Sequence, residues 1–294
     1  MRQISCIDPL TPALARTRTI LFRPFDIGKW LTLGFTAWLA VLGQSGGSLN
    51  LDLLAGEKNE GPIREFVRSH WAMIASLAAI LIAILLIVLV AVVWIQSRGT
   101  FMFLDNVVGN RDRVSVPWHR YRAEANSFFR WSLAYAGISL IVLAIFTLVP
   151  LVAIISLVVH GAGVLAAIPV VAYFMMILLL VIVSLYIWIW FTDFASLLMY
   201  KDGIHASQAW PHVVHLFRQY PGAFILYGMM KVILAIGLMF AALIFGLMTC
   251  CCGFALMIIP YVGTVLFLPY YVFMRCYAIE FLRQFGPEYD VYYA

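Results

Sequence analysis

The sequence has few charged residues, and no soluble class of protein fits that shortage. Asp, Glu, Lys and Arg make up 11% of the 294 residues, whereas a typical soluble domain carries about 25%. Apolar residues make up 64% and the mean hydropathy is +0.97, too much apolar surface for a core of this size to hide from water. The segments between the apolar runs reach only about 30 residues, fewer than the roughly 40 below which domains usually need help to fold. These shortages exclude soluble enzymes, secreted disulfide domains and disordered proteins.

The chain also lacks the common signatures of catalysis and metal binding. It contains no GxxxxGK[ST], HExxH or GxSxG sequence and no paired CxxC. Its acidic residues are scattered, so no general acid–base pair is suggested. Three of the five cysteines are consecutive, which does not fit a disulfide framework. We therefore predict a non-enzymatic protein without a cofactor or a metal ion. The first 29 residues contain no apolar block of signal-peptide length.

What the chain does contain is long apolar runs, each near the roughly 20 residues that a spanning helix needs. The predicted fold is an all-α transmembrane bundle, a single domain over residues 1–294. The six predicted spans are Ile27–Leu42, Trp71–Ile95, Phe129–Val159, Val164–Trp190, Ala223–Met248 and Gly253–Phe273. Asp26 is a candidate N-cap for the short first span. Pro150 and Pro169 predict kinks or tilts in the third and fourth.

The basic residues predict how the spans are oriented. With both termini on one face, that face collects 15 Lys and Arg residues, and the other face has only Lys58, Arg64 and Arg68. Because positive residues favour the cytoplasmic side, we expect both termini in the cytoplasm of a cell whose cytoplasmic membrane holds the protein. The cytoplasmic parts are then an interfacial segment 1–26, connections 96–128 and 191–222, and a tail 274–294, with an outer loop 43–70.

Two cytoplasmic connections resemble each other. Val114-Ser115-Val116-Pro117-Trp118 aligns with Ala206-Ser207-Gln208-Ala209-Trp210 at an offset of 92. In each, an extended helix leads to a turn with a glycine (Gly109 or Gly203), then to a serine that is a candidate cap for a short helix. One interpretation is three parallel helical hairpins with cytoplasmic interfacial helices. The alternative is that any helical hairpin in lipid shows this pattern.

Short motifs at both ends of the chain resemble known families. Arg23-Pro24-Phe25-Asp26-Ile27-Gly28-Lys29-Trp30 enters the first span, and Leu268-Pro269-Tyr270-Tyr271-Val272-Phe273 leads to Phe281-Leu282-Arg283-Gln284-Phe285-Gly286-Pro287-Glu288-Tyr289. These motifs resemble uncharacterised bacterial multi-pass membrane protein families. The layout is also similar to the membrane domain that accompanies some glycerophosphodiester phosphodiesterases. The resemblance implies a six-helix inner-membrane protein and supplies no catalytic residues.

Lys231 is the one ionisable residue deep in a predicted span. Nine residues into the fifth span correspond to about 13–14 Å of helix, close to the middle of a hydrocarbon core about 30 Å thick. An unpaired charge there costs at least about 2.5–3.5 kcal/mol. Asp193 is the first candidate partner and Glu280 the second. Lys231 either forms a functional polar site or is held by snorkelling or a structural ion pair.

Two further groups contain residue types that bind metals or take part in redox chemistry. Cys250, Cys251 and Cys252 fall at a predicted outer turn, where successive side chains point in different directions and do not converge on a metal. His205, His212 and His215, with Asp202 nearby, have helical spacing, but Pro211 makes a single helical face doubtful. We favour small residues in a tight turn for the cysteines and interfacial histidines beside lipid headgroups.

A basic stretch with interleaved aromatic residues predicts contacts with anionic lipid headgroups, and no nucleic acid is required. Its candidate contacts are Arg111, Arg113, Arg120 and Arg122, followed by Arg130. The expected partners are therefore membrane lipids and other membrane proteins. The leading functional prediction is a structural or accessory subunit of a membrane assembly. The alternative is a small-solute or lipid transporter with Lys231 in a polar site, because repeats and broken helices mark many transporters.

Overall fold

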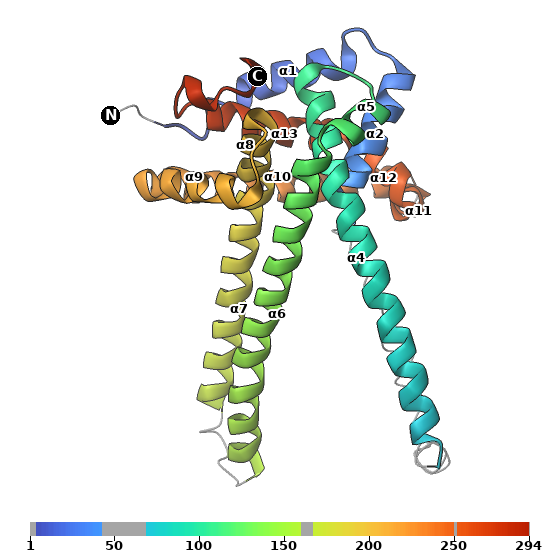
Figure 1. Ribbon diagram of the computed structural model, residues 1–294, viewed down its shortest axis with the longest axis vertical. Coiled ribbons are helices and arrows are strands. Elements are labelled where there is room, and N and C mark those ends of the chain that lie inside the picture. Colours follow the sequence, from blue (N-terminus) through green and yellow to red (C-terminus); the bar gives the residue numbers. More distant parts are fainter. Residues whose placement is uncertain (1–3, 43–68, 160–166, 250–251, 294) are drawn as a thin grey trace.

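The computed structural model describes residues 4–42, 69–159, 167–249 and 252–293, and these ranges are helical without any strand. In Figure 1, α4 (Trp71–Gly109), α6 (Arg122–Val159) and α7 (Ala167–Trp190) extend from one end of the molecule, where most of the other helices pack together. We call the projecting parts the legs: residues 71–94 of α4, 133–159 of α6 and the whole of α7. The packed end is the head. It is formed by α1 (Leu10–Phe22), α2 (Ile27–Val41), α5 (Ser115–Arg120), η3 (Phe191–Ala195), α8 (Ser196–Asp202), α9 (Ala206–Gln219), α13 (Leu268–Arg283) and the adjoining ends of α4, α6 and α10 (Pro221–Met248).

The legs confirm that the chain carries helices long and apolar enough to cross a membrane. Four helices meet that criterion: α4 (Trp71–Gly109), α6 (Arg122–Val159), α7 (Ala167–Trp190) and α10 (Pro221–Met248). At most 6% of the most apolar window of each is buried. Pro150 lies inside α6, and Pro169 lies in the first turn of α7, without ending either helix.

The predicted first span is α2 (Ile27–Val41), and its N-cap is confirmed. The Asp26 carboxylate accepts hydrogen bonds from the backbone N–H groups of Gly28, at 2.7 Å, and Lys29, at 3.4 Å. At 1.5 Å per residue the helix is about 22 Å long, short of the hydrocarbon thickness. It packs antiparallel on the head end of α4, where a Cβ on Gly99 would lie 2.5 Å from the Leu39 carbonyl carbon. Glycine at this position allows the two backbones to approach.

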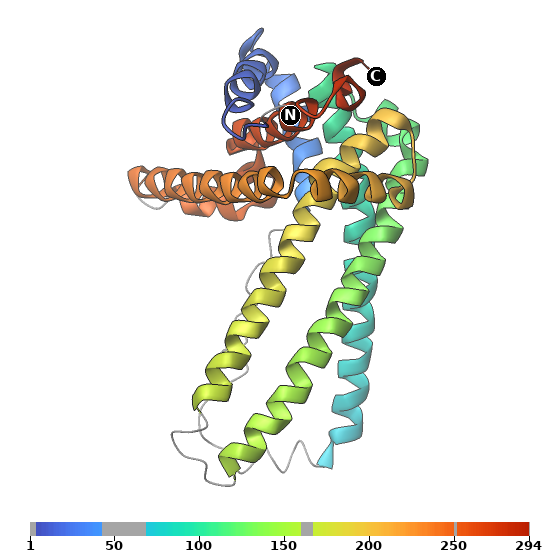
Figure 2. The ribbon, with the colours of Figure 1, turned by 90° about the vertical axis from the view of Figure 1, so that its left-hand side faces the viewer.

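The predicted fifth span forms one helix, α10, but it runs across the legs rather than beside them (Figure 2). Its first turns are anchored in the head by Phe224 and Tyr227, both fully buried. Gly228 then gives room for Tyr186 of α7, whose hydroxyl donates to the Ile225 carbonyl at 2.5 Å. A small residue at a helix crossing permits this close approach.

The predicted sixth span is wrong as a single helix. Residues 252–283 form α11 (Cys252–Ile258), α12 (Pro260–Leu266) and α13 (Leu268–Arg283). Ile259 has φ −70° and ψ 113°, an extended conformation that a following proline favours, since the proline ring clashes with a helical neighbour. The second break, at Phe267, lies just before Pro269 near the start of α13. Pro260 and Pro269 therefore divide the apolar run that hydropathy alone predicts as a single spanning helix.

The two similar connections do share a plan, although their caps differ from the prediction. α4 ends at Asn110 (φ 52°) and α8 (Ser196–Asp202) ends at Gly203 (φ 63°), both left-handed. Short helices α5 (Ser115–Arg120) and α9 (Ala206–Gln219) follow. Neither predicted serine is a cap: Val114 and His205 hold those positions. In the turn between α4 and α5, the Asn106 side chain makes the stabilising bonds instead of a serine. Its amide nitrogen donates to the Arg113 carbonyl, and its oxygen accepts from the Arg113 N–H.

The three-hairpin interpretation does not describe this arrangement. Only α6 and α7 lie side by side as long helices in both views of the described chain (Figures 1 and 2). α2 packs on the head end of α4 and on α12 and α13, and α10 crosses the legs.

The core lies in the head. Its largest fully buried side chains are aromatic and come from α4, η3, α10 and α13: Phe101, Phe191, Phe194, Phe224, Tyr227, Tyr277 and Phe281. The first helix, α1 (Leu10–Phe22), packs on α13, which is followed by the short turns η4 (Pro287–Tyr289) and η5 (Val291–Tyr293). The first and last described helices therefore both belong to the head (Figure 1).

Candidate functional site

A cluster of charged residues is centred on the buried carboxylate of Asp193, which lies in a π-helical turn. This turn, η3 (Phe191–Ala195), joins α7 to α8 without interrupting the helix. An extra residue per turn is rare and often occurs at functional sites. Here it sits where α7 enters the head, and Asp193 is only 7% exposed. A carboxylate buried to this degree must be compensated by cations or donors.

Three side chains from two other helices compensate Asp193. Lys231 Nζ lies 2.5 Å from Asp193 Oδ2, and the Tyr227 hydroxyl donates to the same oxygen at 2.9 Å. Arg275 of α13 lies 3.9 Å from the other oxygen, Oδ1, and its guanidinium donates to the Thr192 carbonyl at 2.9 Å. The cluster therefore fastens α10 and α13 to η3. With one anion and two cations, it carries an excess of one positive charge.

The structure thus brings Lys231 and Asp193 together. The predicted depth of Lys231 near the middle of the membrane, however, assumed a fifth span that runs along the membrane normal. Because α10 runs across the legs, distance along the helix does not convert into depth, and Lys231 lies where α7 meets the head. Glu280, the second candidate partner, does not contact Lys231; its carboxylate lies 3.5 Å from Arg283 of the same helix. This arrangement suits a structural fastening of three segments.

A second buried carboxylate, Asp105, was missed by the sequence analysis. It is 3% exposed near the head end of α4 and accepts hydrogen bonds from the hydroxyls of Tyr121 and Tyr200, both at 3.1 Å. Asp105 is the sole acidic residue in the 39 residues of α4, and that isolation was the available signal. Both Asp105 and Asp193 therefore hold tyrosines from other segments where a long helix enters the head.

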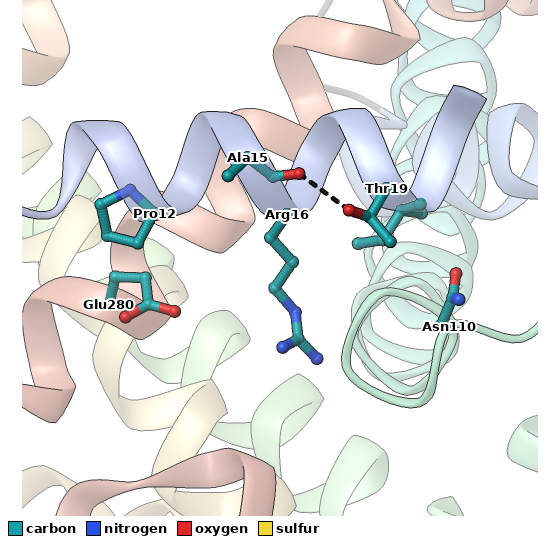
Figure 3. A pocket seen from close by; sticks show the side chains of 7 residues that line it. Pro12, Ala15, Arg16, Thr19, Asn110 and Glu280 are labelled. Carbon is teal, nitrogen blue, oxygen red and sulfur yellow. Dashed lines mark hydrogen bonds between the residues drawn. The ribbon is translucent and has the colours of Figure 1, made fainter. Parts of the chain in front are cut away.

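A pocket of about 440 Å³ opens on the head between α1, α13 and the turn after α4 (Figure 3). The Arg16 side chain extends from α1 between Glu280 and Asn110. Its guanidinium donates to the Val108 carbonyl at 3.0 Å and stacks 3.5 Å from the centre of the Tyr292 ring. Burial raises the pKa of the Tyr292 hydroxyl and that of the nearby Cys276 thiol, the latter to about 12. Arg16 therefore links α1, α4 and the end of the chain.

The histidines do not gather into one site. α9 continues through Pro211, so the doubt about a helical face was wrong for His212 and His215, which lie on exposed positions of that helix. His205 precedes the helix, and His215 pairs with Gln219 at 2.9 Å. Asp202 lies 3.9 Å from Lys201. Across the described ranges, no three His, Cys, Asp or Glu residues form a group that could hold a metal ion.

The remaining predicted residues lie on the surface or beyond what the structure describes. Arg111, Arg113, Arg120 and Arg122 are all exposed, around the turn between α4 and α5 and at the start of α6. Their contact with lipid stays a prediction. Cys250 and Cys251 lie outside the described residues, and Cys252 is the first residue of α11.

Comparison with known proteins gives one match. No curated protein and no solved structure matches the chain. A model of a family of unknown function, DUF7544, matches residues 4–268. That range covers α1 to the break before α13, so the legs, the η3 turn, Asp193 and Lys231 all fall within the matched region. The chain therefore belongs to the family of unknown function DUF7544.

Proposed function

We propose that this protein is a non-enzymatic structural or accessory subunit of an assembly in the cytoplasmic membrane. Its legs cross the bilayer, and its head, with both termini, lies in the cytoplasm. The excess of Lys and Arg on the side of the head supports this orientation. The proposed partners are membrane lipids and helices of other membrane proteins. Because both termini lie on one side, the number of crossings is even, so the proposal includes one crossing before α4 in addition to the three legs, and it includes a bacterial origin.

The observation that carries the proposal is the bare apolar surface of the legs. The most apolar windows of α4 and α7 bury none of their residues, and α4 diverges from the other two legs away from the head (Figure 1). Leu81 and Leu85 on α4 are 66% and 61% exposed. In a bilayer such a helix contacts either lipid or another protein. A single unaccompanied helix on a rigid head is suited to receive a partner helix.

The same structure weighs against transport through Lys231. A transport site needs a polar group that is open to a pathway, whereas Lys231 is paired with Asp193 and only 19% of its side chain is exposed. The excess positive charge beside Arg275 is the one observation that favours the transporter alternative, with an anionic solute. Lys231→Met removes that charge, so a transport activity that is lost in this variant would support the alternative.

Site-specific photo-cross-linking in native membranes tests the subunit role. A photoreactive phenylalanine analogue at Leu85 should give a cross-linked band of discrete mass, since that position faces the bilayer away from the rest of the chain. The matched control is the same analogue at Leu140, a 66% exposed position on α6, whose neighbouring leg α7 already covers part of its helix. A protein adduct at Leu85 that is stronger than at Leu140 is expected. Lipid adducts alone at both positions would overturn the proposal.

A further inference from the structure

The legs and the head meet at a sharply defined level. Along α4 the residues are exposed up to Trp94 and buried from Ser97 onward. Along α6 the last buried residue is Ser132, and from Leu133 onward the described residues are exposed or half-buried. The 24 residues from Trp71 to Trp94 span about 36 Å, enough to cross a hydrocarbon core of about 30 Å. The level of Trp94 and Ser132 is therefore where headgroups would surround the protein.

A pocket of about 520 Å³ opens at this level. It lies between α4, α6 and the turn that precedes α9, and its lining consists of aromatic, amide and basic side chains without any carboxylate. The lining residues are Trp94, Ala123, Asn126, Phe129, Arg130 and His205.

A buried cation stands behind the pocket. Arg98 is only 5% exposed and lies between the rings of Trp94 and Trp118, 4.8 and 5.0 Å from their centres. One guanidinium nitrogen donates to the Trp118 carbonyl at 3.0 Å, and another donates to Asn126 Oδ1 at 3.3 Å. Its Nε is buried and has no acceptor in the described chain. The bond from Arg98 fixes the Asn126 side chain by its oxygen, and its NH2 group supplies two further donors.

The positive charge here is not neutralised by the protein. Among the described residues, neither Arg98 nor Arg130 lies within 4.0 Å of a carboxylate. Arg130 is exposed at the mouth of the pocket, and it has no hydrogen-bond partner in the described chain. Guanidinium groups are well suited to recognise a phosphate, and Arg130 lines the pocket with its donors unused. The pocket is therefore suited to an anion with several acceptor oxygens.

The surroundings add an apolar requirement. Trp94 and Phe129 line the pocket beside the legs, as aromatic residues do at membrane interfaces. Directly below lie exposed leg residues, Val90 on α4 and Leu133 on α6, along which acyl chains can pack. We propose that this pocket binds the phosphate of an anionic phospholipid, with Arg130 and Asn126 as the direct contacts and Arg98 as the cation behind them. These residues are distinct from the exposed Arg111, Arg113, Arg120 and Arg122.

Binding of defined short-chain ligands to the purified full-length protein in a neutral detergent tests the proposal. Microscale thermophoresis measures the dissociation constant for dioctanoyl phosphatidylglycerol, for dioctanoylglycerol and for sodium phosphate at matched ionic strength. Arg130→Gln should weaken phosphatidylglycerol binding about tenfold, the loss of one charge-assisted contact. Arg130→Lys keeps the charge but loses the planar donor geometry of the guanidinium, so it should weaken binding by about threefold, less than Arg130→Gln does.

The matched control is Arg218→Gln, which removes the same charge from an exposed position outside the pocket and should change binding less than about twofold. Circular dichroism verifies that each variant is folded. Equal weakening by Arg130→Gln and Arg218→Gln would show a general charge effect and overturn the proposal. Dioctanoylglycerol binding as tightly as phosphatidylglycerol would overturn the role of the phosphate. Inorganic phosphate binding as tightly as the lipid would identify a free phosphate as the ligand and overturn the lipid assignment.

Discussion

The legs and the head are both apolar, yet they are organised in opposite ways. The legs display isoleucine, leucine and valine outward, and their most apolar windows bury at most 6% of their residues. The head encloses tightly packed aromatic rings, such as Tyr227 stacked on Tyr277 with centres 5.1 Å apart, together with buried carboxylates. The leg helices are the more apolar, since α1, α9 and α13 of the head carry many polar residues. The two regions differ further in the direction in which their apolar surface faces.

This difference shows that a single helix can have two environments, exposed in a leg at one end and buried in the head at the other. α4 is bare from Trp71 to about Trp94, and the same helix is buried from Ser97 to Val107. Its buried end contains Arg98, Asp105 and Asn106, polar residues whose hydrogen bonds lie within the head. Stability of the fold should therefore depend on the head, while the legs should tolerate apolar exchanges.

The largest expected effect comes from removing the anion at the base of the head. Asp193→Ala leaves Lys231 and Arg275 without their carboxylate, and uncompensated buried charge of this kind typically costs about 3–5 kcal/mol. Thermal or denaturant unfolding in micelles, followed by circular dichroism, measures the loss. Because Lys231→Met removes one of the two stranded cations, the double variant should recover part of it. A single variant within about 0.5 kcal/mol of the wild type would show that the cluster does not fasten the head.

A slightly smaller effect is expected from leucine truncations that compare the two regions directly. Leu104 on α4 is fully buried in the head, whereas Leu140 on α6 is 66% exposed on a leg. Leu104→Ala should cost about 2–5 kcal/mol, through lost contacts and the cavity left behind. Leu140→Ala leaves no cavity and should change the same unfolding free energy by about 0.5 kcal/mol or less. Equal losses at both positions would mean that the legs are packed like the head.

The legs could be predicted from the sequence because length and apolar composition alone define them. Hydropathy does not show how a helix is tilted relative to the others, so α10 was predicted to run parallel to the legs. In the structure α10 crosses the legs, with its contact to α7 at Gly228 and Tyr186. Pro260 and Pro269 are present in the sequence, but the prediction of a single sixth span followed the apolar run and took no account of them.

The site was only partly accessible to sequence reasoning. Asp193 was inferred as a partner for Lys231 because an intramembrane charge requires one. Asp105, Tyr227 and Arg275 were not, because their contacts depend on how η3, α10 and α13 meet in space. Much of the head arises from residues that the hydropathy pattern assigned to the N-terminal segment, the connections and the tail, while α2 and the first turns of α10 come from predicted spans.

The smallest of these effects compares two helical glycines. A Cβ on Gly99 would lie 2.5 Å from the Leu39 carbonyl carbon and 2.7 Å from the Ala40 nitrogen, whereas a Cβ on Gly137 meets nothing within 4 Å. Gly99→Ala therefore forces the backbones of α2 and α4 apart and should cost about 1–3 kcal/mol of unfolding free energy. Gly137→Ala, on the α6 leg, should be neutral or stabilise by up to about 1 kcal/mol, because alanine favours the helix. Since the two substitutions add the same methyl group to helices of similar hydropathy, opposite signs would measure the contrast between leg and head with composition held constant. A loss at Gly137 as large as at Gly99 would place α6 in a protein interface even in the purified chain.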